Sequence, residues 1–419
     1  MRLSMSQLLA ITIWVLQLRT AIGQHRLVQE YSGSDFFSKW EYDGGVARGN
    51  AQFVDENTAI QQKLTFVESS TGHAIVRVDN TTSVGAGSFA RRNSVRITSK
   101  DAYPIGSLII MDVIHMPYGC SVLPSFRTSG NSITRPHAGE IAIIETEDGI
   151  SMNPNYMALY TDAGCIQSSY AVQSGSTVER NCSPDLGCRV EQTDPESSGS
   201  ELAEAGGGIF AAQIDPAGIF IWFWSRGTAP ASISKSKAIV DISDWGQASA
   251  SYLNDTCEVK KHFGPQKLVL DINICAHWAG TSFESLCPGD CNAYVTGDGK
   301  NYTNAYWEIS YIRVFIDKQS STVLTTEGAE ETASGLATLD TFDVFRPTDS
   351  DTGSSTSNSN TPSLVYSTLD GNDITPTACT PLQVPTDSDS QPRPTSSAIK
   401  HSLNITLLAI LGSIVAVFM

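Results

Sequence analysis

The chain has 419 residues, of which 41% are hydrophobic and 17% are charged, and its formal net charge is −17 at pH 7. A chain this acidic repels the phosphate backbone, so nucleic acid is excluded as a partner. The length is sufficient for one substantial hydrophobic core.

Residues 1–23 have the three parts of a secretory signal peptide. Arg2 provides a basic start, the run Leu8–Leu16 is apolar, and Ala21-Ile22-Gly23 supplies small residues for cleavage. The apolar run is too short for a membrane span, which needs about 20 residues. The sequence therefore predicts a secreted protein whose mature chain begins at Gln24.

Residues 24–318 have the pattern of an all-β domain. Short runs of β-branched and aromatic residues recur, clusters of Gly, Pro, Asn and Asp separate them, and no long helical period is present. We expect an antiparallel two-sheet sandwich of the jelly-roll type. The expected strands are Ser94–Ser99, Ser107–His115, Glu140–Glu145, Ile219–Trp224, Lys267–Ile274 and Trp307–Phe315.

Eight of the nine cysteines lie in this body, and Cys379 follows it. An even number of cysteines in a secreted chain predicts up to four disulfides, whose connectivity the spacing alone does not determine. Close spacing makes Cys182–Cys188 and Cys287–Cys291 the simplest local pairs. Zinc is not expected, because no cysteine pair is matched by histidines at ligand spacing. Sequons typical of a secreted glycoprotein begin at Asn80, Asn181, Asn254 and Asn301.

Residues 319–396 are rich in Ser, Thr, Pro and Asp, and their only basic residues are Arg346 and Arg393. Such a segment cannot bury enough apolar surface to offset its conformational entropy, so we expect a disordered, O-glycosylated stalk. Residues 397–419 combine small residues, a polar spacer and an apolar tail, which predicts a glycolipid (GPI) anchor in the outer leaflet at the cell surface. A C-terminal membrane helix is the alternative, but the run Ile405–Met419 is short for a span.

The segment Gly139-Glu140-Ile141-Ala142-Ile143-Ile144-Glu145 places two glutamates in an apolar strand pattern. Side chains alternate between the faces of a regular strand, so Glu140 and Glu145 would point to opposite faces. One extra residue in a β-bulge brings both carboxyl groups to the same face. Two facing carboxylates, one nucleophile and one acid/base, are what retaining glycoside hydrolysis requires. A strand with a solvated polar edge is the alternative for so short a pattern.

Other short motifs accompany this segment along residues 35–316. They are Phe53-Val54-Asp55, Ser94-Val95-Arg96-Ile97, His115-Met116-Pro117, Trp222-Phe223 before Arg226-Gly227, Trp278-Ala279-Gly280 and Ala305-Tyr306-Trp307-Glu308-Ile309. With these motifs the chain resembles fungal members of glycoside hydrolase family 16, the endo-β-1,3(4)-glucanases. The resemblance implies a curved β-jelly roll with a glycan cleft on its concave face and β-glucan as the polysaccharide partner.

The resemblance also implies roles for single residues. Glu140 falls on the position of the nucleophile, and Glu145 falls on that of the acid/base. No cofactor is implied, and a structural Ca²⁺ ion is compatible with such sandwiches although no ligands can be assigned to it. Arg96 has a structural alternative as a strand residue that pairs with an acidic neighbour. The implied substrate-binding residues are Gln52, Arg96, Tyr160 and Trp278.

Several positions depart from the family pattern. Ala142 stands where the family has an aspartate that helps to orient and tune the nucleophile. Its absence removes a hydrogen-bond partner from Glu140 and alters the proton affinity of Glu145. Lost aromatic platforms weaken stacking on sugar rings, and new arginines are compatible with a more polar or anionic glycan. The departures besides Ala142 are Leu123, Arg127 and Arg135 for tryptophans, Tyr160 for a histidine, Gln52 for an asparagine and His277 for an aspartate.

Three functions are compatible with these observations. The one we favour is a retaining glycosidase, or a related transglycosidase, acting on cell-wall β-1,3(4)-glucan. A catalytically weak or inactive protein that binds glucan is the second, and Ala142 motivates it. A purely structural wall protein leaves the pair of Glu140 and Glu145 unexplained. Hydrolysis and transfer share one covalent intermediate, so the sequence does not separate them.

Overall fold

The computed structural model describes residues 24–47, 49–87, 90–130, 138–146, 155–183, 187–235, 237–276, 287 and 289–317. The predicted signal peptide (1–23), stalk (319–396) and anchor signal (397–419) lie outside the described residues. Within the described ranges, no helix is long and apolar enough to cross a membrane.

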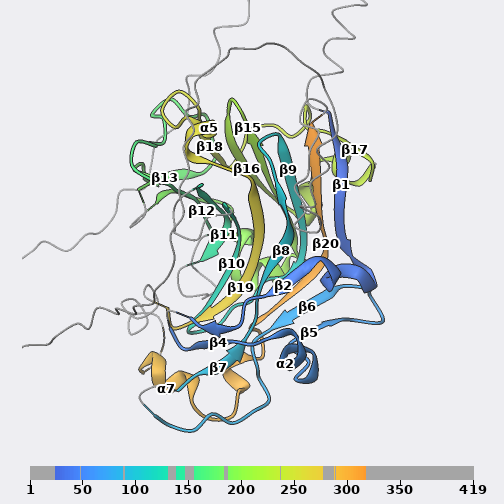
Figure 1. Cartoon of the computed structure of the whole chain (residues 1–419), viewed down its shortest axis with the longest axis vertical. Helices are drawn as coiled ribbons and strands as arrows, with labels where there is room; N and C mark the ends of the chain where they lie inside the picture. Colours follow the sequence, from blue (N-terminus) through green and yellow to red (C-terminus); the bar gives the residue numbers. More distant parts are fainter. Residues whose placement is uncertain are drawn as a thin grey trace, which may run out of the picture. The chain divides into compact units, whose positions relative to one another are not determined.

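The first of two large sheets has nine strands (Figure 1). They are β1 (Gln24–Ser32), β5 (Thr65–Val67), β6 (Ala74–Arg77), β9 (Ser107–His115), β15 (Gly208–Asp215), β16 (Gly218–Ser225), β17 (Ile239–Asp241), β18 (Ala250–Leu253) and β20 (Tyr306–Asp317). Their order is β17-β1-β20-β9-β15-β16-β18, while β6 pairs with β20 and β5 pairs with β6.

The second large sheet has eight strands and carries the two glutamates. They are β2 (Trp40–Tyr42), β8 (Arg96–Tyr103), β10 (Val122–Gly130), β11 (Glu140–Thr146), β12 (Asn155–Tyr160), β13 (Ser176–Glu179), β14 (Cys188–Glu191) and β19 (Gln266–Ile274). Their order is β13-β14-β12-β11-β10-β19-β8-β2. A small third sheet has the order β3 (Gly45–Val46), β4 (Ala51–Phe53) and β7 (Arg92–Ser94), and its β4 and β7 are parallel.

The described helices are all short. They are α2 (Glu56–Gln61), α3 (Gly199–Glu204), α4 (Ala231–Lys235), α5 (Val259–His262) and α7 (Cys291–Val295), with 3₁₀ turns η1 (Gly33–Lys39), η2 (Pro195–Ser197), η3 (Arg226–Thr228) and η4 (Lys300–Tyr302). The prediction of an all-β, antiparallel jelly-roll sandwich is confirmed. The predicted strand 94–99 is divided at Val95, because β7 pairs in the small sheet whereas β8 pairs with β19 in the large one.

Alternation along β19 shows how one sheet separates a core from a polar face. Its residues Leu268, Leu270, Ile272 and Ile274 are fully buried in the main hydrophobic core. The core also contains Phe210 and Ile221 of the nine-stranded sheet, so it lies between the two sheets. The intervening residues of β19, including Lys267 and Asp271, project from the opposite face. This opposite face is called the polar face below.

Four disulfides join the eight cysteines of the body, and the predicted local pair Cys182–Cys188 is one of them. The predicted pair of Cys287 with Cys291 is wrong. Cys291 begins helix α7 and pairs with Cys275 at the end of β19, whereas Cys287 pairs with Cys120. Tertiary contact between β19 and α7 thus overrides proximity in the sequence. The fourth bond joins Cys165 to Cys257.

Candidate active site

Strand β11 contains the β-bulge that the sequence predicts. On the side of β10, Phe126 pairs with Ile144, whereas the next residue, Arg127, pairs with Ala142. The register with β12 shifts at the same place. Ile143 is therefore the additional residue, and it moves every following side chain of β11 to the opposite face.

The bulge brings Glu140 and Glu145 to the polar face together. Glu140 pairs with Ser129 of β10, and Glu145 pairs with Ser125 of the same strand. The two serines are separated by an even number of residues, so they share a face, and their cross-strand partners share it with them. Glu140 is only 4% exposed, whereas Glu145 is half-buried.

Asn155, the first residue of β12, holds the bulge in place. Its Oδ1 accepts a hydrogen bond of 2.9 Å from the backbone N–H of Glu145, and its Nδ2 donates one of 3.2 Å to the carbonyl of Ile143. These backbone groups lose their regular ladder partners at the bulge, and leaving them unpaired is costly. Because Asn155 is fully buried, it replaces solvent at this point.

Asn155→Ala is expected to lower the free energy of unfolding by about 2 kcal/mol, because two buried backbone groups lose their partners. It is also expected to reduce kcat by about tenfold or more, because the spacing of Glu140 and Glu145 depends on the bulge. Denaturant unfolding and initial rates on β-glucan measure the two effects.

The control is Gln167→Ala, which removes a buried amide bonded to Gln173 and to the carbonyl of Ser251, away from β11. It should lose stability without a specific loss of kcat. Equal rate losses in both variants would mean that the bulge does not depend on Asn155 for its geometry.

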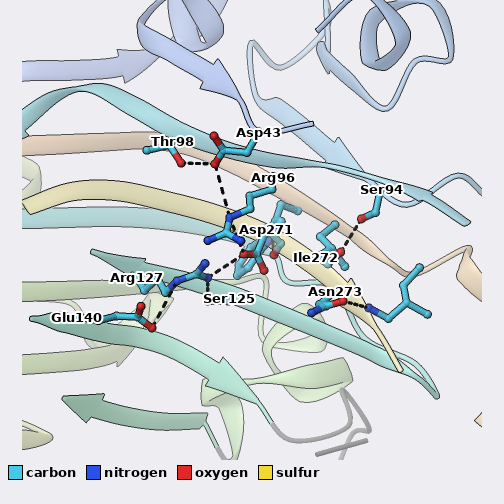
Figure 2. Close-up of polar contacts among 12 residues, drawn as sticks. Asp43, Ser94, Arg96, Thr98, Ser125, Arg127, Glu140, Asp271, Ile272 and Asn273 are labelled. Atoms are coloured by element: carbon cyan, nitrogen blue, oxygen red, sulfur yellow. Dashed lines mark hydrogen bonds and ion pairs between the residues drawn. The ribbon is translucent and has the colours of Figure 1, made fainter. Parts of the chain in front are cut away.

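A row of alternating charges crosses the polar face toward Glu140 (Figure 2). Arg127 Nη1 lies 2.8 Å from Asp271 Oδ2, and Arg127 Nε lies 3.6 Å from Glu140 Oε1. Each of the three side chains is less than one-tenth exposed, with 9% for Arg127 as the largest value. Water therefore screens these attractions weakly.

The row continues from Asp271 to the edge of the sheet. Arg96 Nε lies 3.7 Å from Asp271 Oδ2 and 3.6 Å from Asp43 Oδ2 (Figure 2). Its guanidinium also lies over the ring of Phe53, 5.9 Å from the centroid. These contacts place Arg96 between two acidic neighbours, which is the structural alternative given for it, and they connect it to Glu140 through Asp271 and Arg127.

The arginine next to Glu140 is permanently charged. Burial by itself lowers the pKa of Arg127, but the carboxylates of Asp271 and Glu140 act in the opposite sense, and the pKa is raised above its usual value. A guanidinium in this position cannot serve as an acid or base, so its effect is electrostatic and geometric.

Tyr160 of β12 contacts the second glutamate directly. Its hydroxyl donates a hydrogen bond of 2.8 Å to Glu145 Oε2. Burial raises the pKa of Tyr160, and the negative charge of Glu145 raises it further, so the phenol stays a neutral donor. Tyr160, predicted to bind substrate, is thus placed where it can orient Glu145.

Of the remaining predicted substrate-binding residues, Gln52 and Trp278, the structure describes Gln52. Gln52 lies on β4 in the small sheet, where its Nε2 donates to the carbonyl of Gly45 over 3.0 Å. Trp278, Arg135 and His277 lie outside the described residues. Across the described ranges, no group of three or more His, Cys, Asp and Glu side chains is arranged to hold a metal ion.

Sequence reasoning missed Asp271 and Asn155. A charged residue at alternate positions of an otherwise apolar strand was the available signal for Asp271, since Lys267, Val269 and Asp271 share the polar face. Asn155 had no such signal, because its role depends on the backbone of the neighbouring strand. The assembled face offers two carboxyl groups, one beside a fixed cation and one beside a neutral donor, which suits nucleophilic and acid/base chemistry.

Two proteins of known families of activity are similar to this chain in sequence. A probable glycosidase of Schizosaccharomyces pombe is 31% identical over 303 residues, which cover 70% of this chain and 69% of that protein. A probable endo-1,3(4)-beta-glucanase of Aspergillus niger is 31% identical over 335 residues, which cover 76% of this chain. The match spans only 44% of the Aspergillus protein.

Two solved structures are similar to this chain in sequence and in fold. Laminarinase 16A from Phanerochaete chrysosporium, solved with beta-glucans in donor and acceptor sites, is 31% identical with a TM-score of 0.66, over 70% of this chain and 99% of that one. An elongating family 16 beta-1,3-glucosyltransferase is 34% identical with a TM-score of 0.64, over the same shares of 70% and 99%. The model of the XgeA-like catalytic GH16 domain matches residues 35–315. This match covers more than half of the chain, and the chain therefore belongs to glycoside hydrolase family 16.

Proposed function

We propose that the chain is a retaining glycosidase that acts on β-1,3(4)-glucan, with Glu140 as nucleophile and Glu145 as acid/base. The observation that carries the proposal is the bulge at Ile143, which brings both glutamates to one face of the sheet. Membership of the family and the names of the Aspergillus and Phanerochaete relatives support β-glucan as the substrate class.

The proposed reaction has two steps. A carboxylate oxygen of Glu140 attacks the anomeric carbon while Glu145 gives its proton to the glycosidic oxygen, so that the C–O bond breaks and a glycosyl ester forms. Glu145 then accepts a proton from water, the water oxygen attacks the same carbon, and the ester breaks. Two inversions leave the product in the configuration of the substrate.

The charges of the polar face favour a neutral glycan over an anionic one. In the row of contacts, the carboxyl groups of Asp43, Asp271 and Glu140 lie next to the guanidinium groups of Arg96 and Arg127. Glu145 adds a further carboxyl group beside them. An arginine whose charge is already balanced in this way has little attraction left for an acidic sugar. Arg127 therefore supports a neutral substrate, contrary to the anionic alternative that its presence in the sequence suggested.

The full-length protein, produced in a secretory host so that its disulfides form, is expected to release reducing ends from laminarin and lichenan but not from carboxymethylcellulose. Proton NMR of the first product should show the β-anomer, because the mechanism retains configuration. Glu140→Gln is the matched control. The α-anomer as first product would contradict the mechanism, and retained binding of laminarin without any release would show a glucan-binding protein instead of an enzyme.

Transfer is a second candidate, because the solved structure with 34% identity is named an elongating beta-1,3-glucosyltransferase. A sugar hydroxyl then replaces water in the second step and the rest of the mechanism is unchanged. Incubation with laminari-oligosaccharides followed by mass spectrometry decides between the two. Products longer than the starting oligosaccharide indicate transfer, whereas shorter products alone indicate hydrolysis.

A further inference from the structure

The guanidinium of Arg127 is anchored at Nη1 and approaches Glu140 with Nε. Its Nη1 donates hydrogen bonds of 2.8 Å to both Ser125 Oγ and Asp271 Oδ2. Its Nε makes no hydrogen bond to any described residue and lies 3.6 Å from Glu140 Oε1. Because a guanidinium is planar and rigid, anchoring Nη1 also sets the position of Nε.

The separation between Arg127 and Glu140 has a chemical consequence. A distance of 3.6 Å is too long for a hydrogen bond, but it is short enough for a strong attraction between buried charges. The guanidinium therefore orients the carboxylate of Glu140 by electrostatic attraction and not by a hydrogen bond from Nε.

Ala142 makes room for this arrangement. It is the direct cross-strand partner of Arg127 and lies between Glu140 and Glu145 on the polar face of β11. Opposite residues in antiparallel strands have Cβ atoms only about 5 Å apart, so a carboxylate at position 142 would meet the guanidinium. The methyl group of Ala142 does not compete with the carboxylate of Glu140 for the guanidinium of Arg127.

We propose that Arg127, anchored by Asp271, is a positioning residue that orients Glu140 for attack, and that Ala142 is its required partner. The inference rests on the proposed function of Glu140 as nucleophile. It also gives a reason for alanine at position 142. The absence of a carboxylate there accompanies the presence of the Arg127 guanidinium on the neighbouring strand.

The test compares Arg127→Met and Arg127→Lys in the full-length protein. Arg127→Met should lower kcat on laminarin by about 10²-fold with KM changed less than about threefold, because orientation is lost while the sugar contacts remain. Arg127→Lys should restore only part of kcat, because a lysine keeps the positive charge without the planar fork of the guanidinium.

Arg313→Met is the matched control for loss of a buried ion pair. Arg313 on β20 of the other sheet is 7% exposed and contacts Glu30 Oε1 with Nε and Nη2, both at 3.0 Å. The variant Arg313→Met should lose stability as Arg127→Met does, but its kcat on laminarin should be unchanged. A second variant, Ala142→Asp, keeps Arg127 but offers it a nearer carboxylate, and it should also lower kcat.

A measurement that does not need turnover separates this inference from the proposed function. In full-length protein with ¹³C-labelled glutamate, the Glu140 carboxyl signal is the one absent from Glu140→Gln. Its chemical shift at a fixed pH should change in Arg127→Met and stay in place in Arg313→Met. If the parent protein releases no sugar, the proposed function fails while this chemical shift still tests the contact. Parental kcat with an unmoved chemical shift in Arg127→Met, or a gain of rate in Ala142→Asp, overturns the inference.

Discussion

Glu140→Gln is expected to lower kcat on laminarin by at least about 10⁴-fold, because an amide cannot form the glycosyl ester. The loss should persist on aryl β-glucosides, whose good leaving groups need no proton. Added azide should restore turnover in Glu140→Ala and yield the α-glycosyl azide, because a small anion occupies the vacated space and attacks once, with inversion. Initial rates and the configuration of the azide product measure the effect.

Glu145→Ala should behave differently, and the difference identifies the roles. It loses turnover of laminarin by about 10²–10⁴-fold, since the leaving sugar is no longer protonated. On an activated aryl glucoside it should still form the glycosyl ester, and azide should then give the β-product. Glu308→Gln on β20, whose carboxyl contacts His73, is the control expected to keep parental rates. An α-azide from Glu145→Ala and a β-azide from Glu140→Ala would exchange the two assignments.

Removing the disulfide between Cys165 and Cys257 is expected to cause a large loss of stability. The bond closes a loop across a sequence separation of 92, and both cysteines are almost fully buried. The chain-entropy relation predicts a loss of about 4–5 kcal/mol in the free energy of unfolding for the double alanine variant. Denaturant unfolding of the oxidised protein measures it.

The disulfide between Cys182 and Cys188 supplies the comparison. It is equally buried but spans a separation of only 6, so the same relation predicts a loss of about 2 kcal/mol. The backbone N–H of Cys182 donates to the carbonyl of Cys165 over 3.1 Å, so the two bonds are neighbours in the fold. Equal losses in the two double variants would show that packing of the sulfur atoms outweighs the entropy of the unfolded chain.

The sequence by itself determined the fold class and the need for a bulge between Glu140 and Glu145. These properties are local, because alternation along one strand reports which side chains share a face, and two glutamates out of phase cannot meet without an extra residue. The strand Ser107–His115 appears with its predicted bounds for the same reason. The short spacing of Cys182 and Cys188 predicted their bond correctly, although the same argument failed for Cys287 and Cys291.

The tertiary structure alone decided what surrounds the two glutamates. Asp271 is far from Arg127 and Glu140 in the sequence. The three side chains meet because β19, β10 and β11 are neighbours in one sheet. The same distance in sequence explains why Cys287 was assigned to Cys291 and not to Cys120. Local periodicity carries no information about which strands become neighbours, since pairing depends on how the whole core is buried. The partner of each charge on the polar face is therefore a property of the assembled sheet.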